Sequence, residues 1–453
     1  MPSTKTKTST KKKNTMKSKK TARKRTLLIV ESPSKAKVIG KYLGPSYNVL
    51  ASVGHVRDLP KSRLGIDIEN QFEPGYINIR GKGDKIKELK KAASSASRVL
   101  LATDPDREGE AISWHLAYLL DIDPKSECRI VFNEINKEAV KEAIKHPRSI
   151  DMGLVDAQQA RRVLDRLVGY QISPLLWQKV RRGLSAGRVQ SAALKMICDR
   201  ENEIKSFVPE EYWTITADYG DNFNASLSKY NGEDIRITKA EEADNIEKQL
   251  SAGRFVVESV KTGKRKPKPY APFTTSSLQQ DASIKLNFQT KKTMQIAQQL
   301  YEGIEVKGIG TRGLITYLRT DSVRISSAAK EAASEFITNK FGKEYSSNNS
   351  FSNKNKDIQD AHEAIRPTDV NLEPEAIRDS LTLDQFKLYT LVWNRFVASQ
   401  MAAAEFDTVT VTIDNNGYEF RSSGSRLVFD GWRRVYPIAS DKDSYVPELK
   451  KGD

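Results

Sequence analysis

The first third of the chain alternates short apolar runs with longer amphipathic runs. The apolar runs at 26–30 and 97–103 predict two strands buried on both faces, since runs of this length between polar residues are typical of parallel strands. The runs that follow them, at 35–43 and 108–120, have the periodicity of helices. Strands that alternate with helices indicate an α/β unit with a parallel sheet over residues 27–150.

Helical and strand patterns then replace each other along the rest of the chain. Residues 156–205 are mainly helical in pattern, and an apolar stripe at helical spacing is expected to be their buried face. The stripe consists of Ala160, Val163, Leu164, Leu167 and Val168, whereas Arg161, Arg162, Asp165 and Arg166 fall off it. The alternation at 212–219 predicts a strand, helical patterns return from 276, and strands resume from 406. The two strand-rich parts are therefore expected to form one β domain interrupted by a helical insertion, in which the Ser- and Asn-rich stretch 342–358 is a loop.

Composition fits a multi-domain globular protein. At 453 residues the chain is long enough for roughly three domains. No stretch approaches the ~20 apolar residues of a membrane-spanning helix. The two cysteines, Cys128 and Cys198, provide neither a disulfide framework nor a zinc quartet, which suits a reducing cytoplasm.

The net charge of +16 is concentrated at the N-terminus. Residues 1–26 hold eleven Lys and Arg and no acid, so the remainder carries 63 basic and 58 acidic side chains. Because this stretch has almost no apolar residues, we expect a disordered basic leader, without the apolar core of a signal peptide. Attraction to nucleic-acid phosphates and a role as a solubilising tail both remain open for it.

Acidic residues follow the second predicted strand at Asp104, Asp106, Glu108 and Glu110. Carboxylates crowded at a strand end repel one another, unless a hard cation such as Mg²⁺ binds between them. The carboxyl ends of parallel strands are also where open α/β sheets bind ligands. The alternative is a solvated acidic turn. Glu31 ends the first strand in the same way, and Lys35, one helical turn later, is placed to pair with it or to reach a phosphate. An ordinary loop acid and a surface lysine are the alternatives for these two residues.

A tyrosine in the helical insertion is a candidate nucleophile. Tyr317 follows a glycine-rich approach, Gly308 to Gly313, and Arg319 lies two residues further on. A phenol is a poor nucleophile unless a base takes its proton or a cation stabilises the phenolate. The guanidinium of Arg319 is suited to holding the phosphate under attack. A tyrosine simply packed in a turn is the alternative.

Cationic and aromatic residues are interleaved between 161 and 191. Arginines and rings in such a mixture suit a single strand of nucleic acid, since bases stack on rings and phosphates pair with arginines. The small residues of 183–191, at an expected helix start, add main-chain N–H groups as a phosphate seat. Core packing of Tyr170 and Trp177 is the alternative. His55 and His362 lie near charged partners but lack a second His or Cys at metal spacing, so we expect no transition-metal site.

Taken together, these motifs resemble the type IA DNA topoisomerases, in particular the bacterial topoisomerase I branch. The resemblance covers about 27–453, with seven motifs in the family's order. They are Leu28–Lys37, Val53–Pro60, Ala102–Glu110, Asp156–Trp177, Leu184–Ser191, Gly313–Ser322 and Ala361–Pro367. The Glu-Ser-Pro-Ser-Lys and Tyr-Leu-Arg forms favour topoisomerase I over the topoisomerase III branch.

The resemblance implies an α/β plus mainly-α plus β-arch architecture, in which a Rossmann-like Toprim domain is part of a multi-domain toroid. The expected domains are a disordered basic leader (1–26), the Toprim domain (27–150), the first part of a helical DNA-groove domain (151–206), a β arch (207–271 and 404–453) and a helical domain with the nucleophile (272–403). The family's returning segment and C-terminal zinc or basic modules have no counterpart before residue 453, so the ring is expected to be incomplete at the C-terminus.

The family's chemistry implies roles for individual residues. Tyr317 resembles the nucleophile, which forms a 5′-phosphotyrosine link and frees a 3′-hydroxyl. Glu31 resembles the general acid for the leaving oxygen, while Lys35 and Arg319 stabilise the transition state. Asp104, Asp106 and Glu108, with Glu31, are expected to hold Mg²⁺. Strand passage and religation then relax negative supercoils without ATP, in agreement with the absence of a G-x-x-x-x-G-K-[ST] motif.

The implied partner is the single-stranded segment of negatively supercoiled DNA, and the expected state is a cytoplasmic, nucleoid-associated monomer with no membrane contact. The residues that match the family's DNA-binding positions are His55, Arg161, Arg162, Asp165, Tyr170, Trp177, Ser185, Ala186, Gly187, Arg188, Val189, Gln190, Arg319 and His362. Two alternatives remain: a single-strand-binding fragment that lacks catalysis because its groove is unfinished, and another Toprim enzyme such as a primase or nuclease, which leaves Tyr317 unexplained.

Overall fold

The computed structural model describes residues 25–220, 223–352, 362–438 and 445–453. Apart from its last two positions, the predicted basic leader lies outside the described residues, as does the predicted loop 342–358 from residue 353 onward. The earlier part of that loop forms a short 3₁₀ helix, Lys343–Tyr345. Among the described residues, no helix is both long enough and apolar enough to cross a membrane.

The N-terminal part is an α/β unit, which we define as β1 through α4. Strand β1 (Thr26–Val30) lies between β2 (Tyr47–Ala51) and β7 (Arg98–Leu101), and it is parallel to both. The chain thus runs from β1 to β2 on one side and later returns to β7 on the other. That change of direction is a topological switch point, where open α/β sheets bind ligands. The predicted strands and the parallel sheet are confirmed.

The helices of the α/β unit cover this sheet. Helices α1 (Pro33–Leu43) and α3 (Arg107–Leu120) start close behind β1 and β7, as the sequence predicts. The other elements are α2 (Gly83–Ser95), α4 (Lys137–Lys145), the 3₁₀ helix Gly44–Ser46 and two small antiparallel pairs. These pairs join β3 (Arg57–Asp58) to β6 (Ile77–Asn78) and β4 (Ile66–Asp67) to β5 (Glu73–Pro74).

Two long helices lead away from this unit, α5 (Met152–Lys179) and α6 (Arg188–Ser206). The predicted apolar stripe is not the buried face of α5: Leu164 is 48% exposed, whereas Arg166 is buried. Arg166 donates hydrogen bonds to the carbonyls of Leu59 (3.4 Å) and Pro60 (2.8 Å). The helix therefore docks through a guanidinium that donates to main-chain carbonyls of the α/β unit. A pattern of apolar residues does not predict such a polar contact.

Segments far apart in the chain form one sheet, the arch sheet, in the order β10-β9-β15-β14-β11, with β8 on β9. Its strands are β8 (Thr216–Asp218), β9 (Asn224–Tyr230), β10 (Glu233–Asp234), β11 (Val256–Arg265), β14 (Glu405–Asn415) and β15 (Tyr418–Phe429), with helix α7 (Ala240–Ala252) between β10 and β11. Strand β14 pairs antiparallel with β11, so the chain leaves and re-enters this sheet around the helical insertion. Of the predicted strand 212–219, only β8 (Thr216–Asp218) pairs as a strand. Earlier in this segment, Trp213 makes a single bridge to Ile237.

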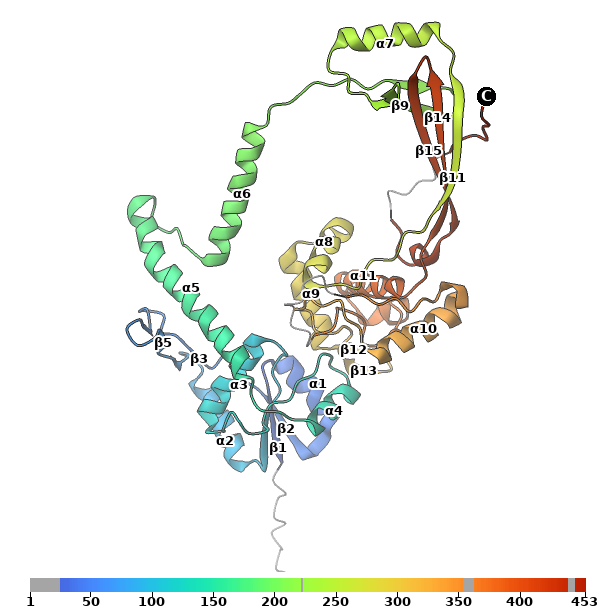
Figure 1. The fold of residues 1–453 in the computed structure, drawn as a ribbon. Coiled ribbons are helices and arrows are strands. Elements are labelled where there is room, and N and C mark those ends of the chain that lie inside the picture. The colour runs from blue at the N-terminus through green and yellow to red at the C-terminus, as the bar shows by residue number, and fades with distance from the viewer. Residues whose placement is uncertain (1–24, 221–222, 353–361, 439–444) are drawn as a thin grey trace, which may run out of the picture.

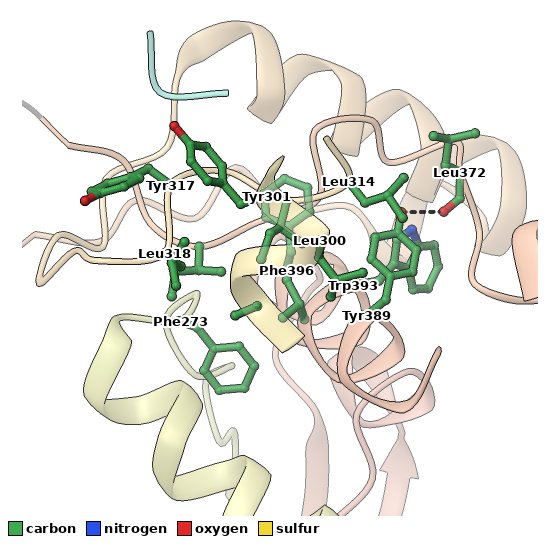
Figure 2. Close-up of a cluster of buried hydrophobic side chains, with 14 of the residues drawn as sticks. Phe273, Leu300, Tyr301, Leu314, Tyr317, Leu318, Leu372, Tyr389, Trp393 and Phe396 are labelled. Atoms are coloured by element: carbon green, nitrogen blue, oxygen red, sulfur yellow. Dashed lines mark hydrogen bonds between the residues drawn. The ribbon is translucent and has the colours of Figure 1, made fainter. Parts of the chain in front are cut away.

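The insertion forms a helical unit, which we define as α8 through α11. It contains α8 (Thr275–Leu286), α9 (Thr290–Glu302), the hairpin β12 (Ile304–Val306) and β13 (Gly310–Arg312), α10 (Ser327–Phe341), the 3₁₀ helix Glu375–Ser380 and α11 (Leu383–Ser399). A last 3₁₀ turn, Gly431–Arg434, follows β15. Figure 2 shows part of the hydrophobic core of the helical unit, around Phe273, Leu300 and Phe396.

The helical unit rests on the α/β unit. One hydrophobic cluster includes Val38 and Ile39 of α1 together with Leu300 of α9 and Leu318. Figure 1 shows the path of the chain: α5 and α6 lead away from the α/β unit, an extended segment crosses to the arch sheet, and β11 returns to the helical unit. Residues almost 300 positions apart are thereby brought to one interface, where the functional site lies.

Candidate active site

The acidic segment after β7 is held in place by several contacts to its main chain. Asp106 is the N-cap of α3, where its Oδ1 accepts a hydrogen bond of 2.8 Å from the N–H of Gly109. A Cβ at Gly109 would lie 2.2 Å from the carbonyl oxygen of Asp104, so only glycine allows this approach. The buried guanidinium of Arg129 donates to the carbonyls of Thr103 and Asp104, each at 2.7 Å. The loop is thus a rigid support for its carboxylates.

Lys35 lies between the carboxylates at the ends of the two strands. Its buried ammonium pairs with both Glu31 and Asp104. Burial alone lowers the pKa of Lys35, but the two carboxylates outweigh it and the pKa is raised. Burial and the charge of Asp104 raise the pKa of Glu31 to about 7, although Lys35 opposes the shift. In this structure the ammonium of Lys35 lies between these two acids.

Tyr317 reaches the acidic segment from the helical unit. Its hydroxyl donates a hydrogen bond of 2.6 Å to Asp106 Oδ2, and Arg319 Nη1 lies 3.5 Å from the same oxygen. Its main-chain N–H donates to the carbonyl of Asn133 in the α/β unit at 2.8 Å. Tyr317 is only 3% exposed, and burial together with Asp104 and Asp106 raises its pKa. The tyrosine is both packed and aimed at an acceptor for its proton.

Tyr301, which the sequence analysis did not single out, is a further member of the site. It lies near the end of α9, is fully buried, and its hydroxyl donates to Asp104 Oδ1 at 3.1 Å. Figure 2 shows Tyr301 and Tyr317 side by side at the edge of the buried cluster. A tyrosine at helical spacing among apolar residues looks like core, so the sequence carries no signal for this role.

The remaining two acids have different surroundings. Glu108 Oε2 lies 3.4 Å from His55 Nε2 and accepts from Gln158 of α5 at 3.2 Å. The hydrogen bond with His55 is the main reason that the pKa of Glu108 is lowered to about 2, against the effect of burial. Glu110 is buried and pairs with Arg129 (2.9 Å) and Arg148 (2.8 Å), so it is part of the framework.

One cleft of about 900 Å³ joins both halves of the site. From the α/β unit and α5 it is lined by Glu31, His55, Asp104, Asp106, Glu108, Gly109, Ile112 and Arg161, and from the helical unit by Met294, Gln295, Gln298, Leu318 and Arg319. The α9 residues were missed by the sequence analysis, because their spacing is that of any helix. The four predicted metal ligands, Glu31, Asp104, Asp106 and Glu108, meet in this cleft, as does Arg319, whereas Glu110 does not line it.

A second cleft, of about 340 Å³, shares His55, Glu108 and Arg161 with the first. Among its other lining residues are Arg162 and Asp165. Arg162 makes a two-pronged ion pair with Asp58, at 2.9 and 2.7 Å. Four of the predicted DNA-binding residues therefore line this cleft, and Arg319 lines the first one.

The aromatic residues of α5 lie at the surface. Tyr170 is 41% and Trp177 48% exposed, which does not fit the core-packing alternative. Their polar atoms are held by main-chain carbonyls, Tyr170 by Lys61 and Trp177 by Leu184, each at 2.5 Å. These contacts fix two ring faces that remain partly open to solvent.

The loop before α6 is tied back to α5. Helix α6 starts at Arg188, within the segment 183–191 where a helix start was predicted. Arg188 pairs with Asp165 at 2.6 Å, and the N–H of Ala186 donates to Ser173 Oγ at 3.0 Å. The N–H of Ala186 is therefore already engaged within the protein. Gln190 donates to the carbonyl of Ser185 at 2.6 Å, and the side chain of Val189 is exposed.

His362 lies elsewhere than expected from a residue of the groove. Its Nε2 is 2.6 Å from the carbonyl oxygen of Pro105, and its ring is 5.6 Å from that of Tyr317. It lines a different cavity, together with Asn133 and Arg148. His362 thus contacts the acidic segment at Pro105 and the ring of Tyr317, and it lines neither of the two clefts described above.

The carboxylates suit a hard cation in their chemistry. All four are oxygen donors on one cleft, and Glu31 Oε2 is a buried oxygen without a hydrogen-bond partner. Among the described residues, however, no three carboxylate, histidine or cysteine side chains are gathered into a ready metal cage. The donor set fits Mg²⁺, and its members are engaged by Lys35, Tyr317 and His55 instead.

Comparisons with known proteins cover most of the chain. The family description "DNA topoisomerase" matches residues 149–453, and "Toprim domain" matches residues 26–135. Among solved structures, the chain is similar to full-length topoisomerase I from Thermotoga maritima, with a TM-score of 0.84 and 43% sequence identity. The similarity covers 94% of this chain and 70% of that chain.

Proposed function

The chain belongs to the type IA DNA topoisomerases of the bacterial topoisomerase I branch, and we propose that Tyr317 is the nucleophile with which it cuts one DNA strand. Enzymes of this family relax negative supercoils without ATP, through transient single-strand cleavage, strand passage and religation, and this chain has their multi-domain architecture. The observation that carries the assignment of Tyr317 is its hydrogen bond of 2.6 Å to Asp106, across the interface of the two units.

The proton transfers follow from the contacts of the two ends of the reaction. Asp106 accepts the phenolic proton as the Tyr317 oxygen bonds to phosphorus. The bond from phosphorus to the 3′-oxygen breaks, and Glu31, whose pKa is raised to about 7, donates the proton that this oxygen takes up. Religation runs the same transfers in reverse, so no external energy source is needed.

Two cations stabilise the charge that spreads over the phosphate oxygens. Lys35 is held by Glu31 and Asp104 on one side of the cleft, and Arg319 lies beside Asp106 on the other. A guanidinium and an ammonium that are already fixed by carboxylates need little reorganisation during the reaction. We therefore expect Arg319→Ala to reduce the rate of cleavage more than it reduces the stability of the fold.

Mg²⁺ is the proposed cofactor, with Asp104, Asp106 and Glu108 as its ligands and Glu31 nearby. When bound, it neutralises charge on the acids and on the scissile phosphate.

The DNA strand is proposed to run from the cleft along α5. His55, Arg161 and Arg162 lie next to the acids, and the exposed rings of Tyr170 and Trp177 follow along the helix. The substrate is the single-stranded segment of negatively supercoiled DNA, which locates the enzyme at the nucleoid in the cytoplasm, and we infer a monomer from a site built within one chain.

The nucleophile is tested with an oligonucleotide labelled at either end. We expect a Mg²⁺-dependent adduct, resistant to denaturing gels, that carries the 3′ label, while the 5′-labelled fragment is released with a free 3′-hydroxyl. Tyr317→Phe should abolish the adduct and plasmid relaxation. An adduct that persists in Tyr317→Phe, or that carries the 5′ label, would contradict the assignment.

A further inference from the structure

Tyr301 links the helical unit to the acidic half of the site. Its hydroxyl donates to Asp104 Oδ1 at 3.1 Å, and its ring meets that of Tyr317 edge to face, with centroids 5.3 Å apart. We propose that Tyr301 is a positioning residue, which orients the Asp104 carboxylate for Mg²⁺ and Tyr317 for attack only while α9 is docked on the α/β unit. The inference rests on the proposed roles of Asp104 and Tyr317.

The orientation of Asp104 depends on few contacts. Both hydrogen bonds of its side chain fall on the same oxygen, Oδ1, one from Lys35 and one from Tyr301. A carboxylate held twice through one oxygen cannot rotate freely, and its other oxygen is left for a ligand in the cleft that Asp104 lines. Partners of this kind orient metal ligands in many sites.

The position of Tyr301 is itself set by the segment that leads to Tyr317. Leu314 donates its N–H to the carbonyl of Leu300 at 2.7 Å. A Cβ at Gly313 would lie 2.6 Å from the carbonyl oxygen of Tyr301, so this segment packs directly on the main chain of Tyr301. The nucleophile and Tyr301 therefore move as one body.

The hydroxyl has a role that the ring alone does not explain. The ring packs against Tyr317 and under the ammonium of Lys35, whose Nζ is 4.7 Å from the ring centroid, and phenylalanine would keep both contacts. Only the hydroxyl bonds to Asp104, and it does so from the opposite unit. When the units separate for strand passage, Asp104 loses this donor and the acidic half of the site relaxes.

The test compares Tyr301→Phe with Tyr389→Phe. Tyr389 is a matched control, because its buried hydroxyl also makes a hydrogen bond, of 2.7 Å to the carbonyl of Leu372, but within the helical unit (Figure 2). We expect Tyr301→Phe to weaken Mg²⁺ binding to DNA-free protein, measured by calorimetry, and to slow single-turnover cleavage, each on the order of 10-fold. Tyr389→Phe should change neither, although both variants lose a buried hydrogen bond and some thermal stability.

A double-mutant cycle separates this role from a merely structural one. If Tyr301 acts through Asp104, Tyr301→Phe should have no further effect on Mg²⁺ binding in an Asp104→Asn background. Wild-type Mg²⁺ affinity in Tyr301→Phe, or additive effects in the cycle, would overturn the inference. Absence of an adduct in the wild type would instead overturn the proposed function, and the metal titration decides about Tyr301 in either case.

Discussion

The hydroxyl of Tyr317, on the helical unit, donates a hydrogen bond of 2.6 Å to Asp106, the N-cap of α3 in the α/β unit. The same carboxylate caps α3 through Oδ1 and accepts the hydrogen bond of the proposed nucleophile through Oδ2. Because the two residues are 211 positions apart, this contact exists only when the two units are docked.

Asp106→Asn separates the capping role of this carboxylate from its proposed chemical roles as proton acceptor and Mg²⁺ ligand. Asparagine is as good an N-cap as aspartate, so we expect little change in the free energy of unfolding. It is a much weaker proton acceptor, and adduct formation in single-turnover assays should slow by on the order of 100-fold. Asp151→Asn is the matched control, since Asp151 caps α5 through a bond of 3.2 Å from Leu154 and should leave cleavage unchanged. Equal rates for both variants would rule out Asp106 as the acceptor.

Glu110 is predicted to matter for stability rather than for chemistry. Glu110→Ala leaves the buried guanidinium of Arg129 without its carboxylate, which should cost about 3–5 kcal/mol of unfolding free energy in denaturant titrations. Glu142→Ala, at an exposed carboxylate paired with Lys145, should give no measurable change. A similar midpoint for the two variants would show that the buried pair does not hold the framework.

His115 is predicted to destabilise the fold in acid. Burial and the charge of Arg57 lower its pKa from 6.5 to about 3, so between these values the unfolded chain binds a proton that the folded chain does not. Stability should therefore be unaffected above pH 6.5 and fall by up to about 1.4 kcal/mol for each pH unit below it. His115→Phe should flatten this part of the pH profile, measured by denaturant titration. Above pH 6.5 the unfolding free energies of the two proteins should differ by an amount that does not change with pH. An unchanged slope below pH 6.5 in His115→Phe would contradict the prediction.

Gly313 is predicted to be essential for docking. In Gly313→Ala the new Cβ would meet the carbonyl oxygens of Tyr301 (2.6 Å) and Ile135 (3.2 Å), which belong to different units and are both main chain. We expect a loss of about 1–3 kcal/mol in unfolding free energy and a larger loss of adduct formation, because Tyr317 is displaced. Gly83→Ala, where the Cβ would meet nothing within 4 Å, is the control. Normal cleavage by Gly313→Ala would show that the segment can shift without cost.

Several features of the fold and the site could be predicted because they depend on neighbours close in the chain. Short apolar runs, caps and glycines set the strands that end before Glu31 and Asp104 and the helix that follows each strand. They also set the start of α6. The buried face of α5 could not be predicted in the same way, since Arg166 is buried by carbonyls of a distant loop. Periodicity reports how apolar a face is and not what packs on it.

From its motifs alone, the sequence predicts the side chains to which we assign the chemistry: the strand-end acids, Lys35, Tyr317 and Arg319. The pairing of Lys35 with Glu31, four residues apart, is also predicted from the sequence. The contacts of Lys35 with Asp104, of Tyr317 with Asp106 and of Tyr301 with Asp104 are visible only in the tertiary structure. The physical reason is that a strand end or a cap is a local property of a few residues. The donor for each buried carboxylate comes from whichever surface docks against it, and that surface lies elsewhere in the chain.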